Sequence, residues 1–374
     1  MSSRPLGIYL HVPFCTRRCD YCAFATWTDK AHLAEGYVET CLAELRRAYE
    51  HEGLGPATTV YIGGGTPSLL APDMLVRLLG AVERAPDAEV TVECNPESTG
   101  APLLEALAGA GVTRISLGVQ SMLPHVLEGL GRAHTPGAVE RAVALVGATG
   151  FPTFNVDLVY GGAGETDADW AGTLERVLAL EPSPPHVSAY ALTVEPGTPL
   201  ARDPSRHPDD DVQAERYAVA DELLGAAGMG WYEISNWARP GHECRHNLDC
   251  WHQADYRGIG CSAHSHLGGR RFWNIRSVER YAAAVALGEQ PIAGEERLSG
   301  PRRRLEALEL ALRTREGVPA DALDGDDPAL AGLAERRGAA WVLTLRGRML
   351  ANEVALRLRA GDEAVAMRPG ARLP

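Results

Sequence analysis

The chain has 374 residues, of which 45% are hydrophobic and 23% charged, a composition typical of a globular protein with a sizeable core. Its formal net charge of −13 argues against general nucleic-acid binding, which needs a basic surface. No apolar run is long enough to predict a transmembrane segment, and the N-terminus lacks the apolar region of a signal peptide, so we expect a cytoplasmic protein.

The densest chemistry follows the first predicted strand, at residues 7–12. Cys15, Cys19 and Cys22 have the spacing C-x3-C-x2-C, and Phe24 stands where a fourth local cysteine could be. Thiolates are the usual ligands of iron–sulfur clusters, and a [4Fe-4S] cube usually takes four of them. Three thiolates leave one iron open to bind a small molecule. A zinc knuckle or three ordinary buried cysteines are the alternatives, although zinc sites usually show two C-x2-C pairs.

The first 200 residues alternate short apolar strands with helical patterns. Strands separated by helices imply right-handed crossovers and a parallel sheet. Six strand–helix units predict an α/β fold with a partial (β/α)6, TIM-like barrel. The predicted strands are 7–12, 58–63, 89–94, 114–120, 153–160 and 186–193.

Most candidate polar residues fall at the carboxyl ends of these strands, where parallel sheets bind ligands. A glycine-rich turn, GGGTP at 63–67, follows the second strand, and its glycines let a ligand approach the backbone. It is not a phosphate loop, because the Lys-Ser/Thr pair is missing. Four further side chains stand at or near strand ends: Glu93, Gln120, Arg132 and Asp157. Each of these alone is explained by a structural hydrogen bond.

The second half of the chain begins with a Pro- and Asp-rich connection at 194–210, followed by a helix at about 211–227. The next segment is crowded with aromatic residues, His and Cys, and it contains HNLDCW at 246–251. Helices at about 305–315, 328–337 and 351–359 and a strand at 341–345 predict a smaller α+β C-terminal domain, for which a winged helix is one option. The expected domains are a barrel core at 1–200, an extension at 201–298 and a small domain at 299–374.

The cysteine spacing, with the aromatic Tyr21 directly before the last cysteine, resembles the signature of the radical S-adenosylmethionine superfamily. In that superfamily the open iron chelates the amino and carboxylate groups of S-adenosylmethionine, and one electron from the cluster cleaves it to a 5′-deoxyadenosyl radical. The resemblance implies a [4Fe-4S] cluster on Cys15, Cys19 and Cys22. It also implies contacts to S-adenosylmethionine from Tyr9, Tyr21, Gly64, Gly65, Thr66, Glu93, Gln120, Arg132 and Asp157.

These positions match one branch of the superfamily, which contains oxygen-independent coproporphyrinogen III dehydrogenases and heme chaperones. HNLDCW resembles the HNxxYW motif of the heme chaperones, with Cys250 in place of the tyrosine. It implies heme as a third cofactor with His246 as its ligand, since imidazole is the common axial ligand of heme iron. A purely structural histidine, a Cys250 thiolate and the nearby His242, His252, His264 and His266 stay open as alternatives.

Two functions follow from the resemblance. The first is a heme chaperone that passes heme to acceptor proteins such as respiratory-chain hemoproteins. The second is an enzyme, the dehydrogenase, in which the radical abstracts hydrogen from propionate side chains before decarboxylation. The dehydrogenases have a longer arm before the first cysteine and a further cysteine at the position of Phe24, so the chaperone is favoured. A plain electron carrier is disfavoured by the open iron. A homodimer is one option for the assembly.

Overall fold

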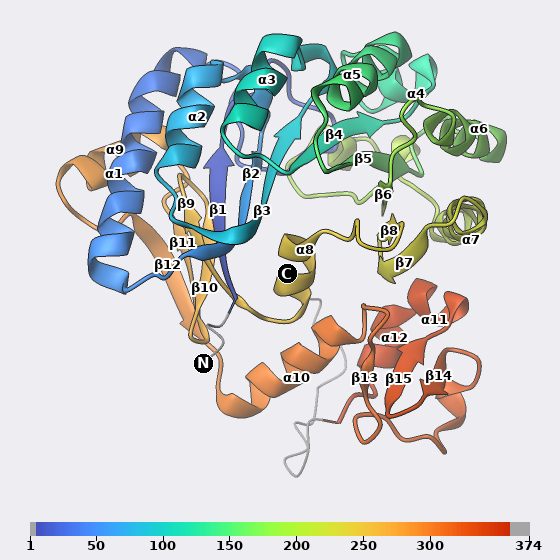
Figure 1. The fold of residues 1–374 in the computed structure, drawn as a ribbon. Coiled ribbons are helices and arrows are strands. Elements are labelled where there is room, and N and C mark those ends of the chain that lie inside the picture. The colour runs from blue at the N-terminus through green and yellow to red at the C-terminus, as the bar shows by residue number, and fades with distance from the viewer. Residues whose placement is uncertain (1–4, 360–374) are drawn as a thin grey trace.

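The computed structural model describes residues 5–359, which form a barrel-like α/β domain and a small second domain (Figure 1). The six predicted strands are confirmed and pair in parallel in chain order. The largest differences are that the third begins at Arg84 and the sixth ends at Ala191. They are β1 (Leu6–Val12), β2 (Ala57–Gly64), β3 (Arg84–Cys94), β4 (Arg114–Gln120), β5 (Thr153–Tyr160) and β6 (His186–Ala191).

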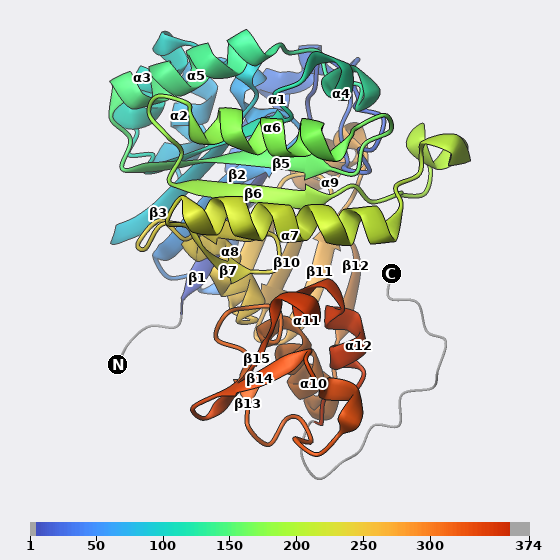
Figure 2. The same ribbon diagram turned by 90° about the vertical axis from the view of Figure 1, so that its right-hand side faces the viewer.

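Helices cover the outer face of the parallel strands (Figures 1 and 2). The first buries Tyr37, Val38, Cys41 and Leu45 against the sheet, as its apolar spacing predicts. The predicted helix at 211–227 is confirmed as the last of the set. The helices are α1 (Ala34–Glu52), α2 (Pro72–Gly80), α3 (Ala101–Gly109), α4 (Pro124–Gly129), α5 (Pro136–Thr149), α6 (Asp167–Leu178) and α7 (Asp210–Ala226), with short 3-10 turns at η1 (Ala31–Leu33), η2 (Pro67–Leu69) and η3 (Pro96–Ser98).

The sheet continues beyond the predicted strands at both edges. One new strand pairs in parallel with β1, three more extend from it in antiparallel order, and a two-stranded hairpin pairs with β6. These strands come from residues 230–297, for which the sequence predicted no regular structure. They are β7 (Gly230–Glu233), β8 (Asn236–Ala238), β9 (Asp255–Ile259), β10 (His264–Leu267), β11 (Arg270–Asn274) and β12 (Ile292–Arg297), and helix α9 (Val278–Ala286) packs on α1.

The small domain has its own hydrophobic core around Leu312, Val318 and Leu343. The predicted helix at 328–337 is wrong: this segment forms a 3-10 turn, η6 (Pro328–Leu330), and then strand β14 (Ala334–Arg337). Gly332 and Gly338 take left-handed φ values of 73° and 61°, which end the turn and close a hairpin with the next strand. The remaining elements are α10 (Gly300–Ala311), β13 (Val318–Pro319), β15 (Ala340–Leu343), α11 (Leu345–Met349) and α12 (Ala351–Ala355). The winged-helix option stays a prediction.

HNLDCW lies on a short helix, α8 (Arg245–Trp251), between the barrel and the small domain (Figure 1). This helix contacts β2, β9 and α10. The arrow of β1 points away from the small domain, so α8 covers the amino-terminal end of the barrel strands. Among residues 5–359, no helix has both the length and the hydropathy needed to span a bilayer.

Candidate functional site

A cavity of about 560 Å³ lies at the carboxyl ends of the barrel strands. Its walls come from the loop after β1, the glycine-rich turn after β2 and the ends of β3 to β6. Of the predicted site residues, the cavity brings together Cys15, Cys19, Tyr21, Cys22, Gly64, Gly65, Thr66, Glu93, Gln120, Arg132 and Asp157. Tyr9 and His246 are not among its lining residues.

The three cysteines of the loop after β1 are free, half-buried thiols that face this cavity. Within the described residues, no three His, Cys, Asp or Glu side chains converge on a point that holds a single metal ion. Three thiols that face one cavity fit a cluster, since each thiolate of a cluster binds a different iron. Arg132 Nη1 donates a hydrogen bond to Cys19 Sγ over 3.4 Å, and Thr66 Oγ1 donates to Cys15 Sγ over 3.6 Å. Burial raises the pKa of the Cys15 thiol, and the hydrogen bond from Thr66 offsets part of this rise.

Asn95 links these two donors. Its Nδ2 donates to Thr66 Oγ1 over 3.1 Å, and its Oδ1 accepts from Arg132 Nη2 over 2.9 Å. A continuous chain of hydrogen bonds therefore runs from Cys15 to Cys19 beneath the cluster loop. Asn95 directly follows the predicted strand at 89–94, but nothing in the sequence alone indicated a role for it.

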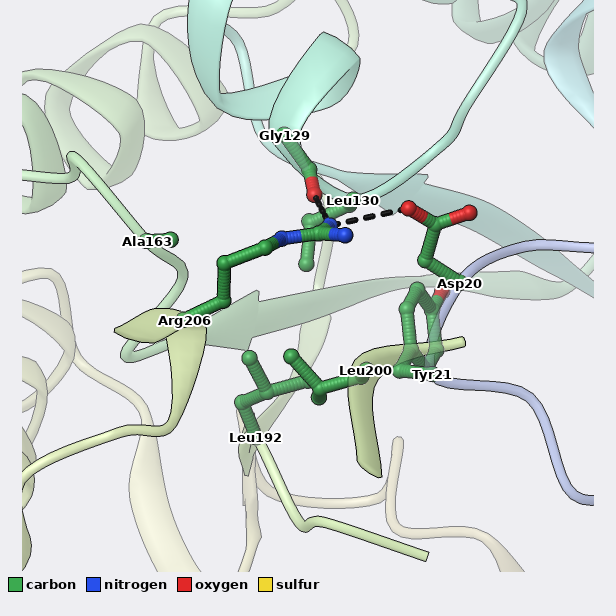
Figure 3. A pocket seen from close by; sticks show the side chains of 8 residues that line it. All are labelled: Asp20, Tyr21, Gly129, Leu130, Ala163, Leu192, Leu200 and Arg206. Carbon is green, nitrogen blue, oxygen red and sulfur yellow. Dashed lines mark hydrogen bonds and ion pairs between the residues drawn. The ribbon is translucent and has the colours of Figure 1, made fainter. Parts of the chain in front are cut away.

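The cluster loop is also held from outside by the connection that follows β6 (Figure 3). Arg206 Nη2 donates to Asp20 Oδ2 over 2.8 Å and to the carbonyl of Gly129 over 2.6 Å. The backbone N–H of Leu200 donates to the carbonyl of Asp20 over 2.9 Å. Two 3-10 turns, η4 (Leu200–Arg202) and η5 (Pro204–Arg206), place these groups. The segment predicted as a simple connection thus fixes the loop between Cys19 and Cys22.

Glu93 presents a carboxylate beside the glycine-rich turn. Its Oε1 accepts from the Tyr61 hydroxyl over 2.8 Å, and its Oε2 accepts from the backbone N–H of Gly64 over 3.0 Å. Burial raises the pKa of Glu93 to about 7. A Cβ on Gly63 would lie 2.8 Å from the carboxyl carbon, so only glycine leaves room for it. The carboxylate faces the cavity without a cationic partner among the described residues, so the site suits a bound ammonium group.

Other residues that line the cavity offer groups that suit anions and hydroxyls. Arg132 Nε is buried and has no hydrogen-bond partner among the described residues, which fits a bound carboxylate. Asp157 accepts from Ser116 Oγ over 2.6 Å and from Asn155 Nδ2 over 3.0 Å, and burial raises its pKa. Gln120 has a φ of 64°, a left-handed conformation that non-glycine residues rarely adopt and that often marks functional sites.

Tyr9 lies below the cavity. Its hydroxyl is 3.0 Å from His11 Nδ1, and its ring stacks on Tyr61 with 6.2 Å between centroids. Tyr9 therefore does not line the cavity itself but packs on Tyr61, which does, and a direct contact with S-adenosylmethionine stays a prediction.

His246 lies farther from the cavity, at the amino-terminal end of the barrel. Its side chain points from α8 into the barrel, where Nδ1 is 2.9 Å from Thr59 Oγ1 and the ring stacks on Tyr61 at 5.1 Å. Only 9% of the residue is exposed, and burial lowers its pKa to about 4, so the imidazole is neutral at physiological pH. Cys250, on the same helix, is half-buried, and burial raises its pKa to about 12. The Cys250 alternative stays open.

A parallel α/β barrel with three cysteines after its first strand, a glycine-rich turn after its second and a polar cavity above both defines a radical S-adenosylmethionine protein. The sequence model of the Radical SAM superfamily matches residues 9–177. The structure resembles coproporphyrinogen III oxidase (HemN) from Escherichia coli, a radical SAM enzyme, with a TM-score of 0.80 at 22% identity over 94% of this chain and 89% of that chain. This likeness shows the shared fold.

Curated relatives narrow the class. The heme chaperone HemW of Mycobacterium tuberculosis is 43% identical over 372 residues, 95% of each chain. HemW of Escherichia coli K12 is 40% identical over 265 residues, 70% of each chain. The chain therefore belongs to the HemW family of the radical SAM superfamily.

Proposed function

We propose that the protein is a heme chaperone that binds a [4Fe-4S] cluster, S-adenosylmethionine and heme and transfers heme to acceptor hemoproteins, such as those of respiratory chains, in the cytoplasm. The observation that carries the proposal is the coexistence of two separate sites in one barrel. The carboxyl end holds the cysteines and the cavity, and the amino end holds His246. Relatives named heme chaperone, similar over 95% of both chains, support it.

The residues at the carboxyl end fit the two cofactors that radical SAM domains use. Cys15, Cys19 and Cys22 would hold the cluster, whose chemistry when bound is the supply of one electron and an open iron. Glu93 suits the ammonium group of S-adenosylmethionine, and the free Nε of Arg132 suits its carboxylate. The large cavity accommodates a ligand of this size.

His246 has the form expected of a heme ligand. The ring is neutral, and its Nδ1 is tied to Thr59, so Nε2 is the nitrogen left for iron. In this conformation the ring is covered, so heme reaches Nε2 only after the residues around that nitrogen rearrange.

Titration of hemin into the wild-type protein and His246→Gln tests the proposal. Gln keeps an acceptor for Thr59 but lacks the imidazole, so hemin should bind at least tenfold more weakly and the Soret band should shift. His252→Ala is the matched control, since His252 lies at the end of the same helix on the surface and pairs with Glu316. Unchanged hemin binding in His246→Gln would remove His246 from the role.

A second assay separates the chaperone from the dehydrogenase. The reconstituted protein is given S-adenosylmethionine, a reductant and coproporphyrinogen III without oxygen. We expect no protoporphyrinogen IX. Its formation at a catalytic rate would overturn the chaperone proposal.

A further inference from the structure

Three layers of inward-facing residues connect the cofactor cavity with the site of His246. Along β2 they are Thr59, Tyr61 and Gly63, because every second residue of a strand faces the same side. Thr59 contacts His246 in the lowest layer, and Gly63 lies against Glu93 in the highest. Tyr61 forms the middle layer, and of these three residues it alone contacts both Glu93 and His246.

Both contacts of Tyr61 are close and specific. Its hydroxyl donates to Glu93 Oε1 over 2.8 Å, while its ring lies nearly parallel to the His246 ring at 26°, with 5.1 Å between centroids. Tyr9 packs on it from the neighbouring strand. Glycines leave the space for this arrangement, since a Cβ on Gly63 would lie 2.8 Å from the Tyr61 ring and one on Gly7 would lie 3.2 Å from His246 Cε1. The packing leaves Tyr61 little room to move independently of either neighbour.

We propose that Tyr61 is a positioning residue that couples the S-adenosylmethionine site at Glu93 to the heme ligand His246, so that each ligand strengthens the binding of the other. The inference rests on the proposed function for its two ligands. It goes beyond that function by assigning communication between the sites to one side chain.

The sign of the coupling follows from charge. An ammonium group bound at Glu93 keeps the carboxylate ionised, and hydrogen bonds to an ionised acceptor are about twice as strong as neutral ones. The Tyr61 hydroxyl is then held more firmly, and with it the ring that fixes one face of His246. A better fixed imidazole binds iron more tightly. Because coupling is reciprocal, bound heme must tighten S-adenosylmethionine binding by the same factor.

The test measures the dissociation constant of S-adenosylmethionine on the anaerobic, cluster-reconstituted protein, with and without bound hemin. In the wild-type protein we expect hemin to lower it at least about fivefold, the low end of typical coupling. Tyr61→Phe keeps the ring but loses the hydroxyl, so the factor should fall to about one while hemin still binds. Tyr49→Phe is the matched control, because the Tyr49 hydroxyl also makes hydrogen bonds, to the backbone of Glu83 on the outer surface.

The outcomes separate the two proposals. If His246→Gln binds hemin like wild type, the proposed heme site fails. If hemin binding needs His246 but leaves S-adenosylmethionine affinity unchanged, the coupling alone fails. If Tyr61→Phe retains the full factor, the coupling does not run through Tyr61. If Tyr61 had only a structural role, Tyr61→Phe would weaken the binding of both ligands, but hemin would still lower the dissociation constant of S-adenosylmethionine by the wild-type factor. If Tyr61→Phe does not fold, Gly63→Ala tests the contact between Tyr61 and Glu93 instead, because the added Cβ would displace Glu93 from Tyr61.

Discussion

Replacing Glu93 by Gln tests the cofactor site through its charge. The carboxylate has two donors, Tyr61 and the backbone of Gly64, and its pKa is about 7 because it is buried. At pH 7.5 most Glu93 side chains are ionised, and at pH 6.0 only about a tenth are. An ammonium ligand needs the ionised form. The wild-type dissociation constant for S-adenosylmethionine should therefore rise roughly eightfold between pH 7.5 and pH 6.0.

The variant should lose both the affinity and its pH dependence. A hydrogen bond to a charged group contributes about 1.5–3 kcal/mol, so Glu93→Gln should bind roughly 10- to 100-fold more weakly at pH 7.5. Isothermal titration at each pH, read as the ratio of variant to wild type, removes the titration of the ligand's own amino group. Glu105→Gln, on the exposed face of α3, is the control. Parallel pH profiles for Glu93→Gln and wild type would refute the assignment of Glu93 to the ammonium.

The same substitution should stabilise the protein without its ligand. Because folding raises the pKa of this carboxyl from 4.5 to about 7, the protein's free energy of unfolding falls as the pH rises through that window, by at most about 3 kcal/mol. Gln avoids this loss, but its amide NH2 cannot accept from the Gly64 N–H, which costs about 1 kcal/mol. Denaturant unfolding at pH 8 should therefore show a net gain of up to about 2 kcal/mol, absent at pH 4.5. A destabilised variant at pH 8 contradicts the burial argument.

Two further predictions concern the supports of the cluster loop. Arg206→Ala should shorten the lifetime of the reconstituted cluster in air several-fold, because Asp20 loses its hydrogen bond from Arg206; the visible absorbance of the cluster measures this lifetime. Arg202→Ala on the same connection is the control. Equal lifetimes in Arg206→Ala and wild type would refute the idea that Arg206 supports the cluster loop. Asn95→Ala should weaken S-adenosylmethionine binding about tenfold and change the EPR spectrum of the reduced cluster, since a buried Arg132 left short of partners costs about 1–3 kcal/mol. The exposed Asn352→Ala should change neither, and an unaltered spectrum in Asn95→Ala would rule out the proposed network.

The barrel and its cavity were predictable because their signals are local. Each parallel strand is a short apolar run between turns, and parallel strands place their carboxyl ends at one edge. Residues as far apart as Cys15 and Asp157 could therefore be assigned to one cavity without knowing their contacts. The small domain shows the limit of such signals. Ala- and Leu-rich residues around 328–337 favour a helix locally, but pairing of Ala334–Arg337 with β15 determines the structure.

His246 shows why the position of the second site within the barrel could not be predicted from the sequence. The motif HNLDCW marks the residue, but its orientation depends on Glu89, whose carboxylate accepts the backbone N–H groups of Arg245 and His246 from a strand more than 150 residues earlier. That contact seats α8 at the amino end of the barrel, where the ring of His246 stacks on Tyr61. A ligand pair at opposite ends of one barrel needs a connection through its interior. The inward face of β2 supplies one, and Tyr61 is the side chain on that face that contacts both Glu93 and His246.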